Sequence, residues 1–196
     1  GNSMSTLKLN NLETVSGTTI TSNSNLALAS EKTLTGAVGS LSIPGTTVQV
    51  QDIGNTGRGA FVYTTSSSFS AVGTNWDVTI TPKFASSKIL LLGNFACKME
   101  GGANKYGYIT LYRAVSGGAT TDLGDLNNSG VMAVDGQMKW TNAKVQYLDA
   151  PNTTSAITYK PYYRSSDGSN EFYVGWTSNS GAAHNLTFLT ALEIAQ

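Results

Sequence analysis

The stretch at residues 143–164, AKVQYLDAPNTTSAITYKPYYR, decides the fold class, because it holds two strand patterns separated by a turn cluster. Asp149, Pro151 and Asn152 are turn-forming residues, and with the threonines that follow they bend the backbone and satisfy its polar groups locally. From Ile157 onward, apolar and polar positions alternate, which is typical of a strand with one buried face. We therefore predict a single β-hairpin.

The second strand of this predicted hairpin has two distinct faces. One face carries Ile157, Tyr159, Pro161 and Tyr163, and the other carries Thr158, Lys160, Tyr162 and Arg164. Because proline has no N–H to donate to a ladder, Pro161 predicts that the strand lies at a sheet edge or carries a bulge.

Residues 46–196 contain eight or nine such strand patterns, separated by polar, glycine-containing turns. This spacing predicts an all-β head, an antiparallel β-sandwich of jelly-roll type. The run 88–95 and the pair Phe188 and Leu189 are apolar on both strand faces, so each needs two covers. We expect the second sheet to be one cover and a neighbouring subunit to be the other.

The N-terminal residues 1–45 differ from the head, because their apolar residues are few, small and separated by glycine and hydroxyl residues. Such a segment cannot offset its chain entropy alone. It is either disordered by itself or forms a slender stalk in which several copies wrap around one another. We expect residues 1–3 to be the remnant of a tag.

The composition excludes several functions. The 196 residues include 12 basic and 12 acidic side chains, which cancel, and no basic cluster predicts nucleic-acid binding. The longest aliphatic run is too short to cross a bilayer, and no signal peptide is visible, so we expect no membrane insertion. Cys97 is the only cysteine and lies in an apolar run, which predicts a buried, unreactive thiol.

Several segments resemble a known family. VQYLDAPNTTSAITYKPYYRS at 145–165, TPKFASSKILL at 81–91 and LTALEIA at 189–195 resemble a tip domain found in tail-fibre-like proteins of tailed bacteriophages. The leader MSTLKLN at 4–10, followed by VSG at 15–17, resembles the start of short fibre proteins of aquatic phages. None of these segments is a catalytic or metal motif.

This resemblance implies a homotrimeric fibre head in the virion tail. Such a protein is made in the host cytoplasm, is released by lysis and contacts other tail proteins. It attaches to a host glycan or an outer-membrane protein without catalysis and without a cofactor. Three weak sites on one rigid head would supply avidity.

Exposed aromatic rings beside amide-bearing loops suit neutral sugars, so the sequence offers candidate receptor-binding residues. They are Tyr106, Trp140, Tyr162 and Tyr173, with the amides of Asn128 and Asn179. The alternative interpretation is that these aromatic residues pack in the core or at a subunit interface.

Other functional interpretations stay open. His184 is an exposed loop histidine or, in a trimer, one of three ligands that hold a metal on the three-fold axis. Asp149 and Arg164 are structural or bind the receptor. A polysaccharide-degrading enzyme would need two of the acidic residues as a pair, and spacing alone pairs none of them. The candidates are Glu100, Asp122, Asp125, Asp135, Asp149, Asp167 and Glu171. A purely structural virion component and a bacterial adhesin are further alternatives.

Overall fold

The computed structural model describes residues 44–53, 61–124, 132–136, 141–175 and 187–196, and the structural statements that follow concern these residues. The leader predicted for residues 1–45 lies outside them except for Pro44 and Gly45.

The described residues form two antiparallel sheets that pack as a sandwich, which confirms the predicted fold class. Sheet A contains β1 (Thr47–Asp52), β2 (Val62–Thr64), β5 (Lys88–Met99), β9 (Thr141–Asp149), β11 (Phe172–Val174) and β12 (Phe188–Ile194). Sheet B contains β3 (Ser70–Ala71), β4 (Val78–Ile80), β6 (Tyr106–Val115), β7 (Thr120–Asp122), β8 (Met132–Asp135) and β10 (Ile157–Ser165). One 3-10 turn, η1 (Thr74–Trp76), precedes β4.

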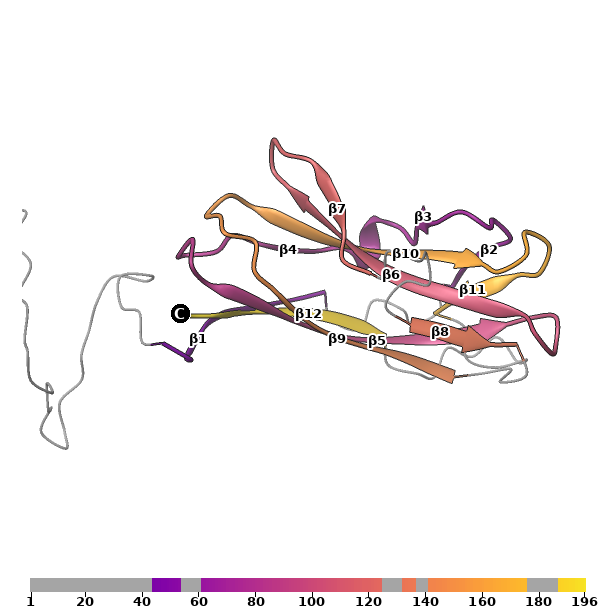
Figure 1. Cartoon of the computed structure of the whole chain (residues 1–196). Coiled ribbons are helices and arrows are strands. Elements are labelled where there is room, and N and C mark those ends of the chain that lie inside the picture. Colours follow the sequence, from indigo (N-terminus) through magenta and orange to yellow (C-terminus); the bar gives the residue numbers. More distant parts are fainter. Residues whose placement is uncertain (1–43, 54–60, 125–131, 137–140, 176–186) are drawn as a thin grey trace, which may run out of the picture. The chain divides into compact units, whose positions relative to one another are not determined.

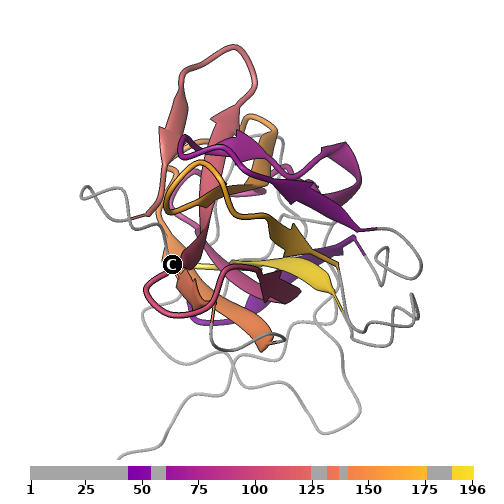
Figure 2. The ribbon, with the colours of Figure 1, turned by 90° about the vertical axis from the view of Figure 1, so that its right-hand side faces the viewer.

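Each sheet is built on one pair of long strands. In sheet A, β5 pairs with β9 on one side, while β12 and β11 pair with successive parts of β5 on the other. In sheet B, β10 pairs with β6 along its whole length, and short strands line the outer edges of both. In Figure 1, β10 and β6 lie in one layer above β12, β5 and β9, and Figure 2 shows the sandwich from its end.

The predicted hairpin at 143–164 is wrong. Its two strands, β9 and β10, lie in different sheets, because β9 pairs with β5 and β10 pairs with β6. The turn cluster does bend the chain, and Asn152 adopts a left-handed φ of 52° there. The connection is long enough to cross the roughly 10 Å between packed sheets. The two strands therefore face each other across the core rather than side by side.

The edge position or bulge predicted from Pro161 is also wrong, because β10 is a central strand with continuous register. The carbonyl of Pro161 accepts a hydrogen bond of 3.0 Å from the amide of Val72, next to β3. In a strand, N and O of one residue point to the same side, so the proline nitrogen faces the gap between β3 and β4. The missing donor is therefore not needed.

The predicted strand faces are confirmed. In β10, Ile157, Tyr159 and Tyr163 are buried against the core while the alternate side chains are partly exposed. In β5, Ile89, Leu91 and Phe95 are fully buried between the sheets. The inner cover of β5 is therefore sheet B, as predicted.

A buried carboxylate links the two sheets. Asp149, at the end of β9, accepts a hydrogen bond of 2.7 Å from Arg113 Nη1 and one of 2.8 Å from Tyr159 Oη. Arg113 and Tyr159 are directly opposite each other in sheet B. Burial first, and then the Asp149 charge, raise the pKa of the Tyr159 hydroxyl, so this phenol stays a donor. The ionic partner of Asp149 is thus Arg113, which supports a structural role for this carboxylate.

A second buried carboxylate fixes the opposite edge of sheet A. Glu193 in β12 has no exposed surface, and its Oε1 accepts from the amides of Lys83 and Phe84 at 2.8 and 3.2 Å. Its Oε2 accepts from Gln49 in β1 at 2.6 Å. The segments TPKFASSKILL and LTALEIA are therefore joined to each other by hydrogen bonds.

Gly107 in β6 lies directly against a core ring. A Cβ at this position would come within 2.0 Å of Phe172 in the facing sheet, and Phe172 is fully buried. We predict that Gly107→Ala lowers the free energy of unfolding by about 2–3 kcal/mol, because the ring has no space to move into. Denaturant unfolding followed by tryptophan fluorescence measures this change.

The matched control is Gly118→Ala. A Cβ at Gly118 would meet its nearest atoms at 3.6 Å, an ordinary contact, in an exposed turn. Its effect should stay within about 0.5 kcal/mol. Equal stability of the two variants would contradict the packing described for Phe172.

Candidate functional site: the outer face of sheet A

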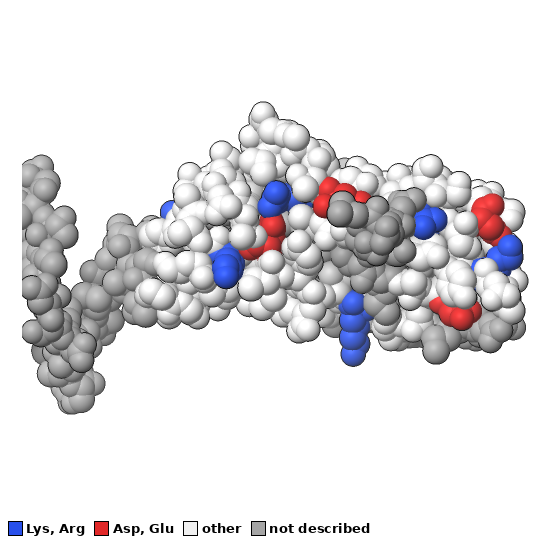
Figure 3. All heavy atoms as spheres, in the orientation of Figure 1, with Lys and Arg blue, Asp and Glu red and all other residues white. Residues whose placement is uncertain are grey.

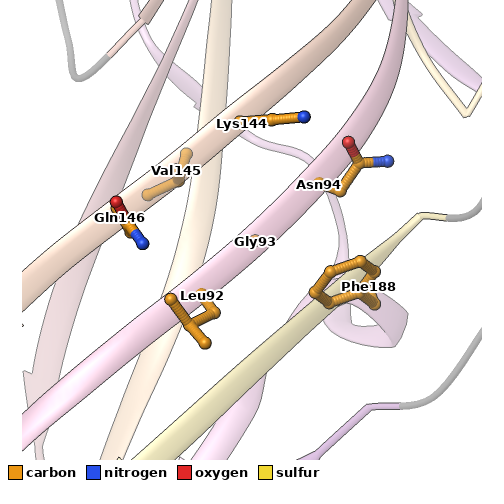
Figure 4. A pocket seen from close by; sticks show the side chains of 7 residues that line it. All are labelled: Leu92, Gly93, Asn94, Lys144, Val145, Gln146 and Phe188. Carbon is orange, nitrogen blue, oxygen red and sulfur yellow. The ribbon is translucent and has the colours of Figure 1, made fainter.

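The outer face of sheet A is hollowed where β9, β5 and β12 run side by side (Figure 4). The hollow has a volume of about 620 Å³. Its lining residues are Leu92, Gly93, Asn94, Lys144, Val145, Gln146 and Phe188. This volume lies within the range of about 300–1,000 Å³ that is common for small-ligand sites. We call this feature the β5 pocket.

Strand register brings the polar lining residues together from distant parts of the sequence. Asn94 in β5 is directly opposite Lys144 in β9 and directly opposite Phe188 in β12. The three side chains therefore form one row across the sheet, with Cβ atoms of neighbours about 5 Å apart. In the next row on this face, Leu92 is opposite Gln146.

The described lining of the β5 pocket combines one aromatic ring, two amides and one ammonium group. Phe188 is partly exposed, whereas Lys144 and Gln146 are exposed. No ion pair involves Lys144 among the described residues, and none of the described residues that line the pocket is acidic. A ring face for C–H groups and amides for hydroxyls are what a saccharide needs.

An apolar row lies beside the β5 pocket on the same face. Val50, Leu192, Leu90 and Leu148 are directly opposite one another in register across β1, β12, β5 and β9. Val50 is 52% exposed and Leu148 is 53% exposed. Leu90 of this apolar row lies on the outer side of β5, the strand for which we predicted a second cover.

Tyr173 lies at the other end of this face, in an aromatic group with Phe61 and Tyr63. The ring centroids of Phe61 and Tyr63 lie 5.9 and 5.4 Å from that of Tyr173. Lys98 Nζ lies 5.5 Å from the Tyr173 centroid, and the Tyr173 hydroxyl donates to Glu171. Burial first, and then this hydrogen bond, raise the pKa of Tyr173.

Tyr106 and Tyr162 lie instead on the outer face of sheet B. The Tyr162 ring stacks on Tyr112 with centroids 4.2 Å apart, and Tyr106 lies 6.3 Å from Tyr108. The Arg164 guanidinium carbon lies 4.1 Å from the centroid of the Tyr108 ring. These tyrosines are partly buried against neighbours, which fits the structural interpretation of the candidate aromatics.

The candidates that the structure describes, Tyr106, Tyr162 and Tyr173, are therefore not brought together on one face. Tyr106 and Tyr162 share sheet B, and Tyr173 lies on sheet A. Trp140, Asn128, Asn179 and His184 lie outside the described residues. Sequence reasoning missed Asn94, Lys144 and Gln146, because only strand register, which is not local, places them around one hollow. The sequence marked Phe188 only as an apolar strand residue, not as part of a binding site.

Most of the acidic residues that an enzyme could use form hydrogen bonds or ion pairs with neighbouring residues. Besides Asp149, Asp122 accepts from Thr110 Oγ1 at 2.6 Å, and Asp167 accepts from Lys105 Nζ at 2.5 Å. The Lys105 ammonium, followed by backbone amides, lowers the pKa of Asp167.

Glu100 and Glu171 are adjacent in the sheet, because the Glu100 amide donates to the Glu171 carbonyl at 3.0 Å. Glu100 forms an ion pair of 2.5 Å with Lys98. Glu171 accepts from the Tyr173 hydroxyl, so both side chains have partners. Asp125 lies outside the described part of the chain.

The described residues offer neither a metal-ligand cluster nor a membrane-spanning helix. No group of three His, Cys, Asp or Glu side chains lies close enough there to hold a metal ion. No helix among them has the length and apolar character that a membrane span requires. Figure 3 shows the few charged side chains on one face, scattered among uncharged atoms.

A scan of family models and a search of curated proteins find no match to this chain. A solved structure of infectious bursal disease virus, Gt strain, is 11% identical with a TM-score of 0.42, covering 88% of this chain and 42% of that chain. The D431N mutant VP2 protein of infectious bursal disease virus is 10% identical with a TM-score of 0.40, covering 75% and 36%.

Eiger TNF from S. frugiperda is 8% identical with a TM-score of 0.36, covering 75% of this chain and 92% of that chain. The chain spans less than half of the two viral chains. At TM-scores this low, none of these similarities carries an argument about function.

Cys97 provides a direct check of the packing of β5. Its thiol has no exposed surface, and burial raises its pKa. We predict that a thiol reagent leaves the native protein unmodified over a period in which the unfolded chain reacts completely. The chain has one cysteine, so the signal reports this site alone. Rapid stoichiometric reaction in native buffer would show that β5 is not enclosed as described.

Proposed function

We propose that this chain is the head of a virion fibre that attaches to a saccharide on the host surface, without catalysis and as a homotrimer. The observation that carries the proposal is the β5 pocket, where a ring, two amides and an ammonium group surround a hollow of about 620 Å³. The resemblance of three segments to phage tail-fibre tips supports the same role.

The chemistry of the pocket suits binding rather than turnover. Phe188 offers a ring face to sugar C–H groups, while Asn94 and Gln146 can bond to hydroxyls. All three residues stand on strands, so the sheet holds them in place. Attachment to a cell surface needs only such a site, repeated on one particle.

The apolar row supports self-association. Val50 and Leu148 are about half exposed at its two ends, with Leu90 and Leu192 between them. Contiguous apolar surface of this kind commonly marks an interface. A homotrimer assembled through this row would present three copies of the β5 pocket to one host cell. In this proposal the head lies in the virion tail and contacts other tail proteins.

The test of attachment is binding of the fluorescently labelled protein to a panel of bacterial cells. We predict that Phe188→Ala weakens binding about tenfold for each site, because a stacked ring is lost. Phe61→Ala is the matched control, since Phe61 is an exposed ring on the same sheet outside the pocket. Loss of binding with Phe61→Ala but not with Phe188→Ala would move the site to the aromatic group around Tyr173.

The same samples distinguish attachment from degradation. Polysaccharides isolated from the bound strains are incubated with the protein, and reducing ends are counted. We expect no release. Release that disappears in Glu171→Gln would establish the rival enzyme, with the neighbouring Glu100 and Glu171 as its carboxylate pair.

The test of assembly is the absolute mass from light scattering after size exclusion. We predict three times the chain mass for the unchanged protein and one chain mass for Leu148→Glu, because a carboxylate would be buried in the interface. Thr121→Glu places the same charge on exposed β7 and should leave the mass unchanged. A monomeric unchanged protein would contradict the trimer.

A further inference from the structure

We propose that the ligand of the β5 pocket is an acidic saccharide, whose carboxylate pairs with Lys144 while its ring lies against Phe188. This inference rests on the proposed function, and it names the class of sugar that the head would recognise. It depends on the position and charge of Lys144, which the proposal of attachment does not require.

The geometry of one row sets the size of the ligand. Lys144, Asn94 and Phe188 stand side by side on β9, β5 and β12. Lys144 and Phe188 stand two strand spacings apart, a distance of about 10 Å. A single pyranose with an acidic substituent spans this width, and Asn94 lies under its middle. Figure 4 shows these three side chains around the hollow, with Gln146 and Leu92 in the next row.

The charge around the pocket favours an anion. Although the whole chain has a formal net charge of zero, none of the described lining residues is acidic and Lys144 is the cation among them. On the same face, Glu100 is paired with Lys98 at 2.5 Å. Asp52 lies on β1, three strand spacings from β9, and it accepts from Thr190 Oγ1 at 3.0 Å.

The separation of Asp52 from Lys144 corresponds to about 14 Å, which exceeds the screening length of about 8 Å at physiological salt. Glu100 and Asp52 therefore do little to neutralise Lys144. Two further cations lie on the outer face of β5. Lys98 is paired with Glu100, and Lys88 is opposite Ile194, six residues along the strand from Asn94. That separation is about 20 Å, so Lys88 does not serve the pocket.

The alternative is a neutral sugar, held by the ring and the amides alone. In that case Lys144 would be a solvated side chain at the rim, and its charge would not matter. The two classes of sugar therefore differ in how binding responds to salt and to the loss of one charge.

The experiment uses the full chain and a panel of purified bacterial polysaccharides, acidic and neutral, each acidic one also in a carboxyl-reduced form. We expect binding to acidic members, with loss on carboxyl reduction and weakening as salt rises from about 0.05 M to about 0.5 M. Lys144→Met should bind them about five- to tenfold more weakly at low salt. Lys88→Met is the matched control and should bind normally.

Each outcome decides between the proposals. Binding to neutral members, or binding that survives both carboxyl reduction and Lys144→Met, would overturn the acidic-sugar inference and leave attachment intact. Binding to cells but to no polysaccharide would also overturn it, and would point to a protein receptor. Absence of binding to any cell or polysaccharide would overturn the proposed function itself.

Discussion

The bond between Asp149 and the pair Arg113 and Tyr159 is the interaction on which the sandwich depends. It comes at the point where the chain leaves sheet A for sheet B, and each carboxylate oxygen accepts from a different residue of the facing sheet. Loss of one partner from a buried ion pair typically costs about 3–5 kcal/mol, because the other charge is left without compensation. These two hydrogen bonds hold the end of β9 against sheet B, although β9 pairs with β5 and β10, which begins after seven connecting residues, pairs with β6.

This division of the strands determines the functional surface. Because β9 joins β5 rather than β10, its outer residues extend the outer face of sheet A, and Lys144 comes to lie opposite Asn94. Glu193 acts on the other side of β5 by holding β12 and the turn that precedes β5. The β5 pocket is thus formed by β9, β5 and β12, and the apolar row extends over these strands and β1.

The sequence predicted what depends on local alternation. The buried face of β10, the fully buried side of β5 and the all-β class all follow from neighbours two residues apart, and the structure has them. The hairpin prediction failed because a turn pattern specifies a change of direction, not the sheet that the next strand joins. The edge position predicted from Pro161 was wrong because the proline nitrogen faces the gap between β3 and β4. No neighbouring strand needs a donor there.

Local sequence patterns could not predict the candidate site, for a similar reason. Asn94, Lys144 and Phe188 are 44 to 94 residues apart in the chain, and register alone makes them neighbours. The three candidate tyrosines within the described residues are instead divided between the two sheets. Buried Glu193 gave one usable signal, since it is a single carboxylate within an apolar strand. Such a residue needs buried donors, although the sequence does not say which.

In the proposed function, the head meets its host through the outer face of sheet A. The most direct measurement is a map of backbone amide shifts, made while the isotopically labelled protein is titrated with a polysaccharide that it binds. The account predicts that the largest changes occur at Asn94, Lys144, Gln146 and Phe188. Changes confined to Tyr108, Tyr112 and Tyr162 on the outer face of sheet B, with β5 and β9 unaffected, would contradict it.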